Sequence, residues 1–285
     1  MFTFGFSRSD HEEDQKIEDS SGQLSWFPAS EIKPTTEQIK SEYRNEDYTE
    51  FLVHNKKIKT IRSENLVLNL SNEDHENILK AESQHSDLLP AIYEGGLKIW
   101  ECSYDLAKYL LENCIDLENK KVLDLGCGAG VLGILTLLKG SNIDFQDYNA
   151  EVIKILTIPN VLLNLDEGQK ISQKCKFYCG DWESFADLSS NRNSKEEDKY
   201  DFIITSETIY NPANQGKLYK VLKKTLKQNG IGYVAGKTYY FGVGGGMRQF
   251  ETLVKEDNFF DVEIVWKSTE GLQREIMKLT RRKTQ

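Results

Sequence analysis

The sequence predicts an α/β fold in which helices cover both faces of a mainly parallel sheet. After about Tyr93, short apolar segments of the kind that form strands alternate with longer segments of helical character, an order typical of such sheets. The first apolar segment runs directly into a glycine-rich turn, residues 126–130, which opens the next helix. The last two strand-like segments have no helical segment between them, which predicts a closing antiparallel hairpin.

In the first half of the predicted sheet, strands are followed by helices. The segment KVLDLG, residues 121–126, has the continuous apolar character of a buried strand, and the helix after it covers residues 131–139. The segment IDFQDY, residues 143–148, is the second expected strand and precedes a helix over residues 151–164. A third strand is expected at CKFYCG, residues 175–180.

The second half of the predicted sheet begins after a polar segment. Residues 188–199 are rich in charged and small polar residues, which predicts a solvated loop. The strand over residues 200–206 leads to a helix over residues 214–228, for which Gly230 is the expected C-cap residue. The remaining expected elements are a strand over 231–240, a helix after the glycines at 244–246, and the hairpin strands 260–268 and 272–282.

An acidic extension is predicted to precede this fold. Residues 1–60 mix charged and small polar residues with few apolar clusters, a composition typical of disorder, and residues 61–285 form the domain with its N-terminal lead-in. Up to Pro90 the chain has 10 Lys and Arg against 18 Asp and Glu, so this third carries −8 of the total charge of −9. Such a chain is a poor partner for nucleic-acid phosphates, so no nucleic acid substrate is expected, but it suits a basic protein.

Composition disfavours several other classes of protein. The longest apolar run, residues 131–138, is far shorter than the roughly 20 residues of a bilayer-spanning helix. The N terminus has no secretory signal pattern, so a soluble intracellular protein without a membrane partner is expected. The five cysteines are irregularly spaced, which predicts reduced thiols and no zinc site. No histidine follows His85, so histidine catalysis or a histidine-bound metal would need a residue of the N-terminal third, and no metal is expected.

The glycine-rich turn and a later acid predict a nucleoside-containing ligand. In VLDLGCGAG, Asp124 lies near the strand end, and Gly126 and Gly128 let a ligand approach the backbone where a helix begins. Asp147 ends the second strand 21 residues after Gly126, where a carboxylate can bind both hydroxyls of a ribose. The alternative is an ordinary strand-to-helix turn with a surface acid after it.

The form of the turn distinguishes between nucleoside ligands. Its G-x-G-x-G spacing after an acid in the strand resembles motif I of the S-adenosylmethionine-dependent methyltransferases with a Rossmann-like seven-strand sheet, whereas dinucleotide enzymes use G-x-G-x-x-G. The C-terminal hairpin also resembles that fold. This cofactor carries an ammonium and a ribose but no phosphate, and Asp124, Asp147 and Glu101 are candidate partners for these groups. No Lys or Arg lies between Lys121 and Lys139 to neutralise a pyrophosphate.

Several longer segments resemble the eukaryotic histidine protein methyltransferases, which modify one histidine of large-subunit ribosomal protein number three. These segments are HSDLLPAIYEGGLKIWECSYDLAKYL, IDFQDYN, TSETIYNP and YYFGVGGG. The resemblance spans about Asp87 to Arg282, together with FTFGF at the N terminus. It implies S-adenosylmethionine as cofactor and methyl transfer to an imidazole nitrogen of a basic ribosomal protein, by a monomeric enzyme of the cytoplasm and the nucleus, including the nucleolus.

The same resemblance implies a set of residues that line the cofactor. YEGGLKIWEC would form a wall or lid, with Trp100 near the cofactor and Glu101 facing its polar end; the alternative for Glu101 is a role in solubility. GDW follows the third strand, where this fold places adenine contacts, and the alternative for Trp182 is core packing. With Asp124 and Gly128 from the turn, the set comprises Ile99, Trp100, Glu101, Cys102, Ser103, Gly126, Gln146, Asp147, Tyr148, Gly180, Asp181, Trp182 and Ser206.

The segment SETIY ends the fourth strand, where seven-strand methyltransferases place the acceptor pocket. It resembles the Asp-x-x-Tyr element of related protein methyltransferases, with Glu207 in place of the acid. Glu207 and Tyr210 are therefore the expected catalytic residues, and a capped strand end is the alternative. Neutral imidazole, with an unperturbed pKa of about 6.5, is already nucleophilic at pH 7. Such an enzyme therefore needs to orient the ring and accept a hydrogen bond from its second nitrogen, for which Glu207 is the candidate.

The residues alone leave the acceptor and the class of activity open. A lysine-specific enzyme of the same fold would use the same cofactor residues. A non-catalytic adaptor would keep the fold in order to present the acidic extension. The histidine assignment depends on the family resemblance.

Overall fold

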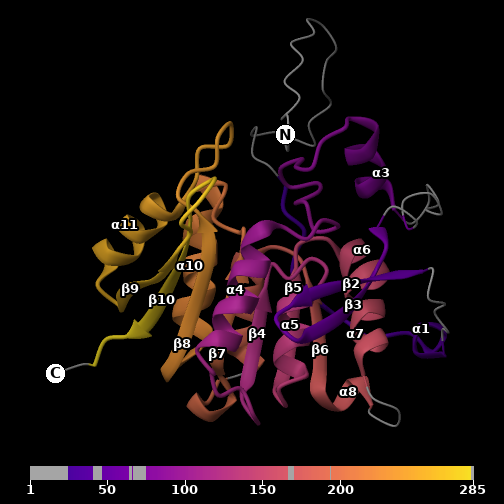
Figure 1. Cartoon of the computed structure of the whole chain (residues 1–285), viewed down its shortest axis with the longest axis horizontal. Coiled ribbons are helices and arrows are strands. Elements are labelled where there is room, and N and C mark those ends of the chain that lie inside the picture. Colours follow the sequence, from indigo (N-terminus) through magenta and orange to yellow (C-terminus); the bar gives the residue numbers. More distant parts are fainter. Residues whose placement is uncertain are drawn as a thin grey trace, which may run out of the picture.

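A computed structural model describes residues 25–40, 47–63, 66, 75–165, 170–192 and 194–283. Its centre is an eight-stranded sheet in the order β1-β6-β5-β4-β7-β8-β10-β9. Figure 1 shows the order of the strands from β6 to β9, and β1 pairs with the outer side of β6. The strands are β1 (Ser30–Ile32), β4 (Lys121–Leu125), β5 (Asn142–Asp147), β6 (Cys175–Cys179), β7 (Tyr200–Ser206), β8 (Leu226–Lys237), β9 (Phe260–Lys267) and β10 (Arg274–Arg281).

The middle strands run parallel and the C-terminal strands do not. β4 pairs with β5 and β7 in parallel, as do β5 with β6 and β7 with β8. β10 lies between β8 and β9 and is antiparallel to both. The predicted parallel sheet with a closing antiparallel hairpin is therefore confirmed. β1 adds an antiparallel strand at the β6 edge, which was not predicted.

Helices cover both faces because the strands bury side chains on both. Val122 and Leu123 are each fully buried but belong to different hydrophobic clusters, since successive side chains of a strand point to opposite faces. One cluster includes residues of the helices α4 (Glu101–Glu112), α5 (Val131–Leu137) and α7 (Ile158–Asn164). The other includes residues of α9 (Trp182–Arg192), α10 (Pro212–Thr225) and α11 (Met247–Asp257). None of the helices in the described ranges is long and apolar enough to cross a bilayer.

The shorter helices are α1 (Thr36–Lys40), α3 (Glu76–Ser83), α6 (Ala150–Val152), the π-helix η1 (Ile153–Thr157), α8 (Ile171–Lys174) and the 3-10 turn η2 (Glu196–Asp198). Because α6, η1 and α7 are continuous, the helix expected over residues 151–164 is confirmed.

Two local predictions are wrong. Gly230 does not cap a helix: α10 ends at Thr225 and Gly230 lies inside β8. A Cβ at Gly230 would lie 3.0 Å from the carbonyl oxygen of Asp201, so the glycine allows two segments of the sheet to approach closely. The loop expected over residues 188–199 is helical as far as Arg192, because α9 buries Ser189 on its inner side.

Part of the segment expected to be mostly disordered is folded against the domain. Within residues 25–61 the structure contains β1, α1 and the hairpin of β2 (Tyr48–Val53) and β3 (Lys56–Ile61). The Ile61 N–H donates to Asn160 Oδ1 of α7 at 2.7 Å. The expected boundary after residue 60 therefore falls inside β3. Residues 1–24, including FTFGF, and residues 41–46 lie outside the described part of the chain.

The parallel strands bring four loops to one edge of the sheet. β4, β5, β6 and β7 share a direction, so their carboxyl ends meet there. The strand order also reverses between β4 and β7. Open sheets of this type bind ligands outside the carboxyl ends of the strands, at the point of reversal.

Candidate active site

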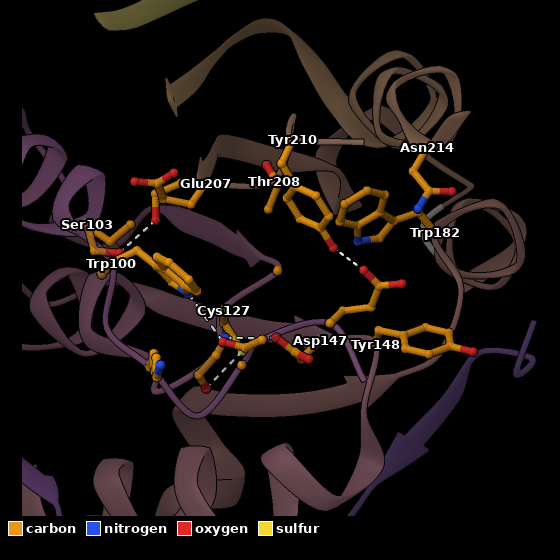
Figure 2. Close-up of a pocket in the computed structure, with 18 of the residues that line it drawn as sticks. Trp100, Ser103, Cys127, Asp147, Tyr148, Trp182, Glu207, Thr208, Tyr210 and Asn214 are labelled. Carbon is orange, nitrogen blue, oxygen red and sulfur yellow. Dashed lines mark hydrogen bonds between the residues drawn. The ribbon is translucent and has the colours of Figure 1, made fainter. Parts of the chain in front are cut away.

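A cavity opens at the carboxyl edge of the sheet, with a volume of about 770 Å³ including its mouth. It is lined by residues 126–128 after β4, residues 147–148 at the end of β5, residues 180–182 after β6 and the segment from Ser206 to Tyr210, leaving out Ile209, after β7 (Figure 2). The remaining lining residues come from other parts of the chain: Trp26, Glu94, Gly95, Gly96, Lys98, Trp100, Ser103, Val131, Leu132 and Asn214.

The glycines of the turn are required by packing between loops. Gly126 has a φ of +67° and Gly128 a φ of +49°, a left-handed conformation that favours glycine. A Cβ at Gly126 would lie 2.5 Å from Thr208 Cγ2, and one at Gly128 would lie 2.9 Å from the carbonyl oxygen of Gly96. Both glycines also line the cavity, so packing adds a second reason for glycine beside the ligand access expected from the sequence.

Asp147 lies at the centre of the cavity wall (Figure 2). Its Oδ2 accepts the Gly128 N–H at 2.9 Å and its Oδ1 accepts the Asn149 N–H at 3.2 Å. Burial raises the pKa of Asp147 to about 6, against these hydrogen bonds, which favour the carboxylate. At neutral pH the side chain is therefore mainly an anionic acceptor, as binding of ribose hydroxyls requires.

Asp124 lies behind the cavity and does not line it. Its Oδ2 accepts the Gly133 N–H of α5 at 2.8 Å, and the side chain is 2% exposed. Burial raises the pKa of Asp124 to about 8. In this structure Asp124 therefore supports the start of α5 and makes no direct approach to a ligand.

At the β6 end of the cavity, aromatic side chains are held by buried polar groups. The Trp182 indole N–H donates to Gln146 Oε1 at 2.9 Å, and Gln146 Nε2 donates to the Gly180 carbonyl at 2.8 Å. Gln146 is fully buried and positions Trp182 without lining the cavity itself. The Tyr148 hydroxyl donates to the Ala91 carbonyl at 2.8 Å.

On the opposite side, the segment before α4 closes the cavity. The Trp100 indole N–H donates to the Gly95 carbonyl at 3.2 Å, and Ser103 Oγ lies 2.8 Å from Ser206 Oγ. Figure 2 shows Trp100 and Ser103 on the side away from Trp182. Of the cofactor residues expected from the sequence, ten line the cavity and five do not: Ile99, Glu101, Cys102, Asp124 and Gln146.

Two carboxylate–phenol pairs lie at the boundary of this cavity. The Tyr210 hydroxyl donates to Glu94, whose other oxygen accepts the Ala91 N–H at 3.0 Å. The Tyr240 hydroxyl donates to Glu207 Oε2 at 2.6 Å. Burial raises the pKa of Glu94, and the hydrogen bond from Tyr210 offsets this only in part. Both expected acceptor residues, Glu207 and Tyr210, therefore lie in one site. Glu207 belongs to a buried pair and Tyr210 to a partly buried one.

A second cavity of about 620 Å³ adjoins the first. The two cavities share four lining residues: Glu94, Trp100, Glu207 and Tyr210. The second is otherwise mainly apolar and is lined by Leu88, Lys237, Tyr239, Tyr240, Phe241, Val243 and Leu272. Tyr239 and Phe241 are both exposed, so the edge of this cavity presents an aromatic rim to solvent.

Four residues of the site were not among those expected from the sequence: Glu94, Thr208, Trp26 and Lys237. The sequence offered an indication for Glu94, because this residue precedes two glycines in the segment expected to form a wall of the cofactor site. Thr208 also had a signal, because it lies within SETIY, the segment expected at the acceptor pocket. Trp26 and Lys237 had no signal in the sequence, and they reach the site through contacts between distant parts of the chain.

The proteins that match this chain are methyltransferases, and their descriptions give two different acceptors, lysine and histidine. Residues 90–242, more than half of the chain, match the family model described as lysine methyltransferase. A histidine protein methyltransferase 1 homolog of Dictyostelium discoideum is 46% identical over 210 residues, which cover 73% of this chain and 63% of that protein. The homolog of Bos taurus is 42% identical over 226 residues, covering 72% and 60%. The chain thus spans somewhat less than two thirds of these relatives.

Among solved structures, the fold is similar to that of a putative S-adenosylmethionine-dependent methyltransferase from Streptococcus mutans. The TM-score is 0.53 at 11% identity, and the match covers 84% of this chain and 57% of that one. At this identity the likeness concerns the fold alone.

Proposed function

The chain belongs to the histidine protein methyltransferase family, and from this premise we propose that it transfers a methyl group from S-adenosylmethionine to a ring nitrogen of a protein histidine. The observation that carries the proposal is the pair of adjoining cavities. One, the deep cavity at the carboxyl edge of the sheet, is lined by the glycine turn and Asp147, and the other is mainly apolar. A transferase needs such a pair, because two substrates have to meet from opposite sides.

The residues of the deep cavity fit the cofactor. Its lining contains four carboxylates, Glu94, Asp147, Asp181 and Glu207, while Lys98 is the single basic side chain among the described lining residues. Lys98 itself pairs with Asp87. An acid-rich wall suits a ligand with an ammonium, a sulfonium and a ribose, and it would repel a pyrophosphate.

Four groups of residues would hold the cofactor. Asp147 would accept the ribose hydroxyls, and residues 126–128 present backbone next to it. Tyr148 and Trp182 supply aromatic surface at the β6 end, and Ser103 and Ser206 lie toward the boundary with the second cavity. When bound, S-adenosylmethionine supplies an electrophilic methyl group on a positively charged sulfur.

The protein's own task is to orient the acceptor. A neutral imidazole needs no strong base, since its lone pair is available at pH 7. Glu207 accepts the Cys102 N–H at 3.3 Å and the Tyr240 O–H at 2.6 Å, and carboxylate oxygens retain further lone pairs. One of these would accept the second ring N–H of the histidine and hold its tautomer. Tyr210, held by Glu94, forms the adjacent wall.

The same site also favours a second candidate, a lysine acceptor. The shared boundary contains two carboxylates, Glu94 and Glu207, which would attract a cationic amine, and the matching family model is described as lysine methyltransferase. A lysine must lose a proton before attack, so its activity would keep rising toward pH 9. A histidine acceptor predicts a rise through the imidazole pKa and a plateau by about pH 7.5.

The substrate, setting and assembly state are part of the proposal. We propose a basic large-subunit ribosomal protein, number three, as substrate, a monomeric enzyme, and a location in the cytoplasm and nucleus, including the nucleolus. The family resemblance supports the substrate, and the net charge of −9 suits a basic partner. We propose neither nucleic acid nor membrane as a direct partner.

One experiment tests the reaction and the acceptor together. The full chain is incubated with radiolabelled S-adenosylmethionine and extract of methyl-deficient cells, and the labelled protein is hydrolysed and analysed. Methylhistidine in a ribosomal protein is expected. Methyllysine would promote the lysine candidate. Tight binding of a protein partner with no transferred label would instead support the adaptor that the sequence left open.

A further inference from the structure

An N-terminal segment crosses the β6 end of the deep cavity. β1 pairs with β6 in antiparallel register, with Ser30 opposite Cys179, and places the preceding residues over the loop after β6. The Asp181 N–H donates to the Phe27 carbonyl at 2.8 Å, and the Ala29 N–H donates to Ser184 Oγ at 2.9 Å. These contacts fix residues 26–29 to the loop after β6 and to the start of α9, which begins at Trp182.

Gly180 makes this crossing possible. Its φ of +101° favours glycine, and a Cβ there would lie 2.5 Å from the Pro28 carbonyl oxygen. The segment therefore lies directly on the glycine of GDW. A residue that the sequence associates with the cofactor is, in the structure, also required by the N-terminal segment.

The indole of Trp26 is held in place at the cavity wall. Lys217 Nζ lies 3.8 Å from the ring centroid of Trp26, and the same nitrogen pairs with Asp181 Oδ1 at 2.6 Å. The ring of Tyr148 meets it edge-on, with centroids 5.4 Å apart and an interplanar angle of 74°. Trp26 itself lines the deep cavity. The indole thus presents aromatic surface to a ligand without first having to be ordered.

The two ends of the cavity have different roles if the proposed function holds. The second cavity, which would hold the acceptor, adjoins the deep cavity at Trp100, Glu207 and Tyr210. The reacting methyl has to lie at that end, because the two reactants need to be in contact. Asp147 marks the position of the ribose. The base, which extends from the other side of the ribose, is then directed toward Trp182 and Trp26.

We propose that Trp26 is a cofactor-binding residue that contacts the aromatic base of the nucleoside. This inference rests on the proposed function. It adds to the site a residue that lies outside residues 90–242, the part that matches the family model. A large aromatic face is suited to a nucleobase, because every base offers a π-surface to stack on.

The test uses two variants of the full chain, Trp26→Leu and Trp26→Phe, with S-adenosylhomocysteine affinity measured by calorimetry. Leucine keeps apolar bulk without an aromatic face, so Trp26→Leu should weaken binding about fivefold to a hundredfold, the range for loss of one base–aromatic contact. Phenylalanine keeps a ring, and Trp26→Phe should stay within about threefold of wild type. Trp266→Leu, in β9 at the opposite edge of the sheet, is the matched control and should bind as wild type.

Other outcomes would overturn the proposal. Unchanged affinity in Trp26→Leu would remove Trp26 from the site. An equal loss in the leucine and phenylalanine variants would assign it a structural role only, and so would a loss in Trp26→Leu accompanied by a matching fall in melting temperature. If the wild-type chain does not bind S-adenosylhomocysteine at all, the proposed function itself is wrong. As a second readout, photolabelling with 8-azidoadenosyl cofactor should mark the peptide that contains Trp26.

Discussion

The Tyr240 hydroxyl donates a hydrogen bond to Glu207 Oε2 at 2.6 Å. The other carboxylate oxygen of Glu207 accepts the Cys102 N–H near the start of α4 and lies 3.8 Å from Lys237 Nζ. Glu207 has a left-handed backbone conformation, with a φ of +58°, which is uncommon for a residue with a side chain. One buried carboxylate therefore connects the end of β7, the start of α4 and the loop after β8, at the boundary between the two cavities.

The first prediction concerns Glu207 as a positioning group. Glu207→Gln keeps the size of the side chain but weakens it as an acceptor, so kcat should fall about tenfold to a hundredfold while S-adenosylhomocysteine affinity changes little. Glu101→Gln is the matched control: Glu101 also approaches Lys237, at 3.3 Å, but lines neither cavity. A loss of activity of equal size in both variants would assign the effect to Lys237 instead of acceptor positioning.

The second prediction concerns the pH dependence of cofactor binding. Because the pKa of Asp147 is about 6, its carboxylate is protonated as the pH falls from about 7.5 to 5 and becomes a weaker acceptor for ribose hydroxyls. S-adenosylhomocysteine affinity, measured by calorimetry, should fall over this interval. Asp147→Ala should lower it by about 1 to 3 kcal/mol at neutral pH and abolish the pH dependence. Asp261→Asn, at an exposed position of β9, serves as control. A pH dependence of affinity that remains in Asp147→Ala contradicts the assignment.

The third prediction concerns Asp124 and stability. Its pKa is raised from 3.8 to about 8 by burial. Between these values the native carboxyl keeps a proton that the unfolded one loses, so native stability falls as pH rises through this interval. Asp124→Asn removes the titration and keeps an oxygen for the Gly133 N–H. The melting temperature of wild type should therefore fall relative to that of the variant from about pH 5 to pH 8.5. This fall corresponds to a loss of more than about 1 kcal/mol in the free energy of unfolding. Parallel melting curves would show that Asp124 is already ionised in the native state.

The fourth prediction compares two glycines. A Cβ at Gly245 would lie 2.2 Å from the Tyr210 carbonyl oxygen, whereas one at Gly216 in α10 would meet nothing within 4 Å. Gly245→Ala should therefore displace the segment that carries Tyr210 and lower both activity and melting temperature. Gly216→Ala should be neutral or stabilise by up to about 1 kcal/mol, because alanine favours the helix. Similar effects of the two substitutions in calorimetry and activity assays would argue against the tight packing at Gly245.

The fifth prediction concerns the aromatic rim of the second cavity. Phe241 is largely exposed there and meets Tyr239 edge-on, with ring centroids 5.0 Å apart. Phe241→Ser should raise KM for the protein acceptor about three- to thirtyfold, because the variant lacks an aromatic side chain that the bound acceptor would bury. S-adenosylhomocysteine affinity should be unchanged. Leu52→Ser, at an exposed site on β2, is the control, and an unaltered KM in Phe241→Ser would move the acceptor surface elsewhere.

The succession of strands and helices along the chain and the position of the cavity could be predicted because they depend on local patterns. Continuous apolar segments such as residues 121–126 identify buried strands, and a glycine turn after the first strand places the ligand at the carboxyl edge. Prediction was less successful where one residue type has several uses. Gly230 matched a helix cap, but it serves strand packing in β8. Asp124 matched a cofactor acid, but it supports α5 from behind the cavity.

By itself the sequence determined the α/β class, the parallel sheet with its antiparallel hairpin, the family and the loops that line the cavity. These follow from hydrophobic periodicity and from motifs whose residues are close together in the chain. Only the tertiary structure decided that Glu94 pairs with Tyr210, that Glu207 pairs with Tyr240, and that Trp26 reaches the wall beside Asp181. Each of these contacts joins segments far apart in sequence. Its formation depends on the packing of whole strands and helices, and the local pattern around either partner does not contain that information.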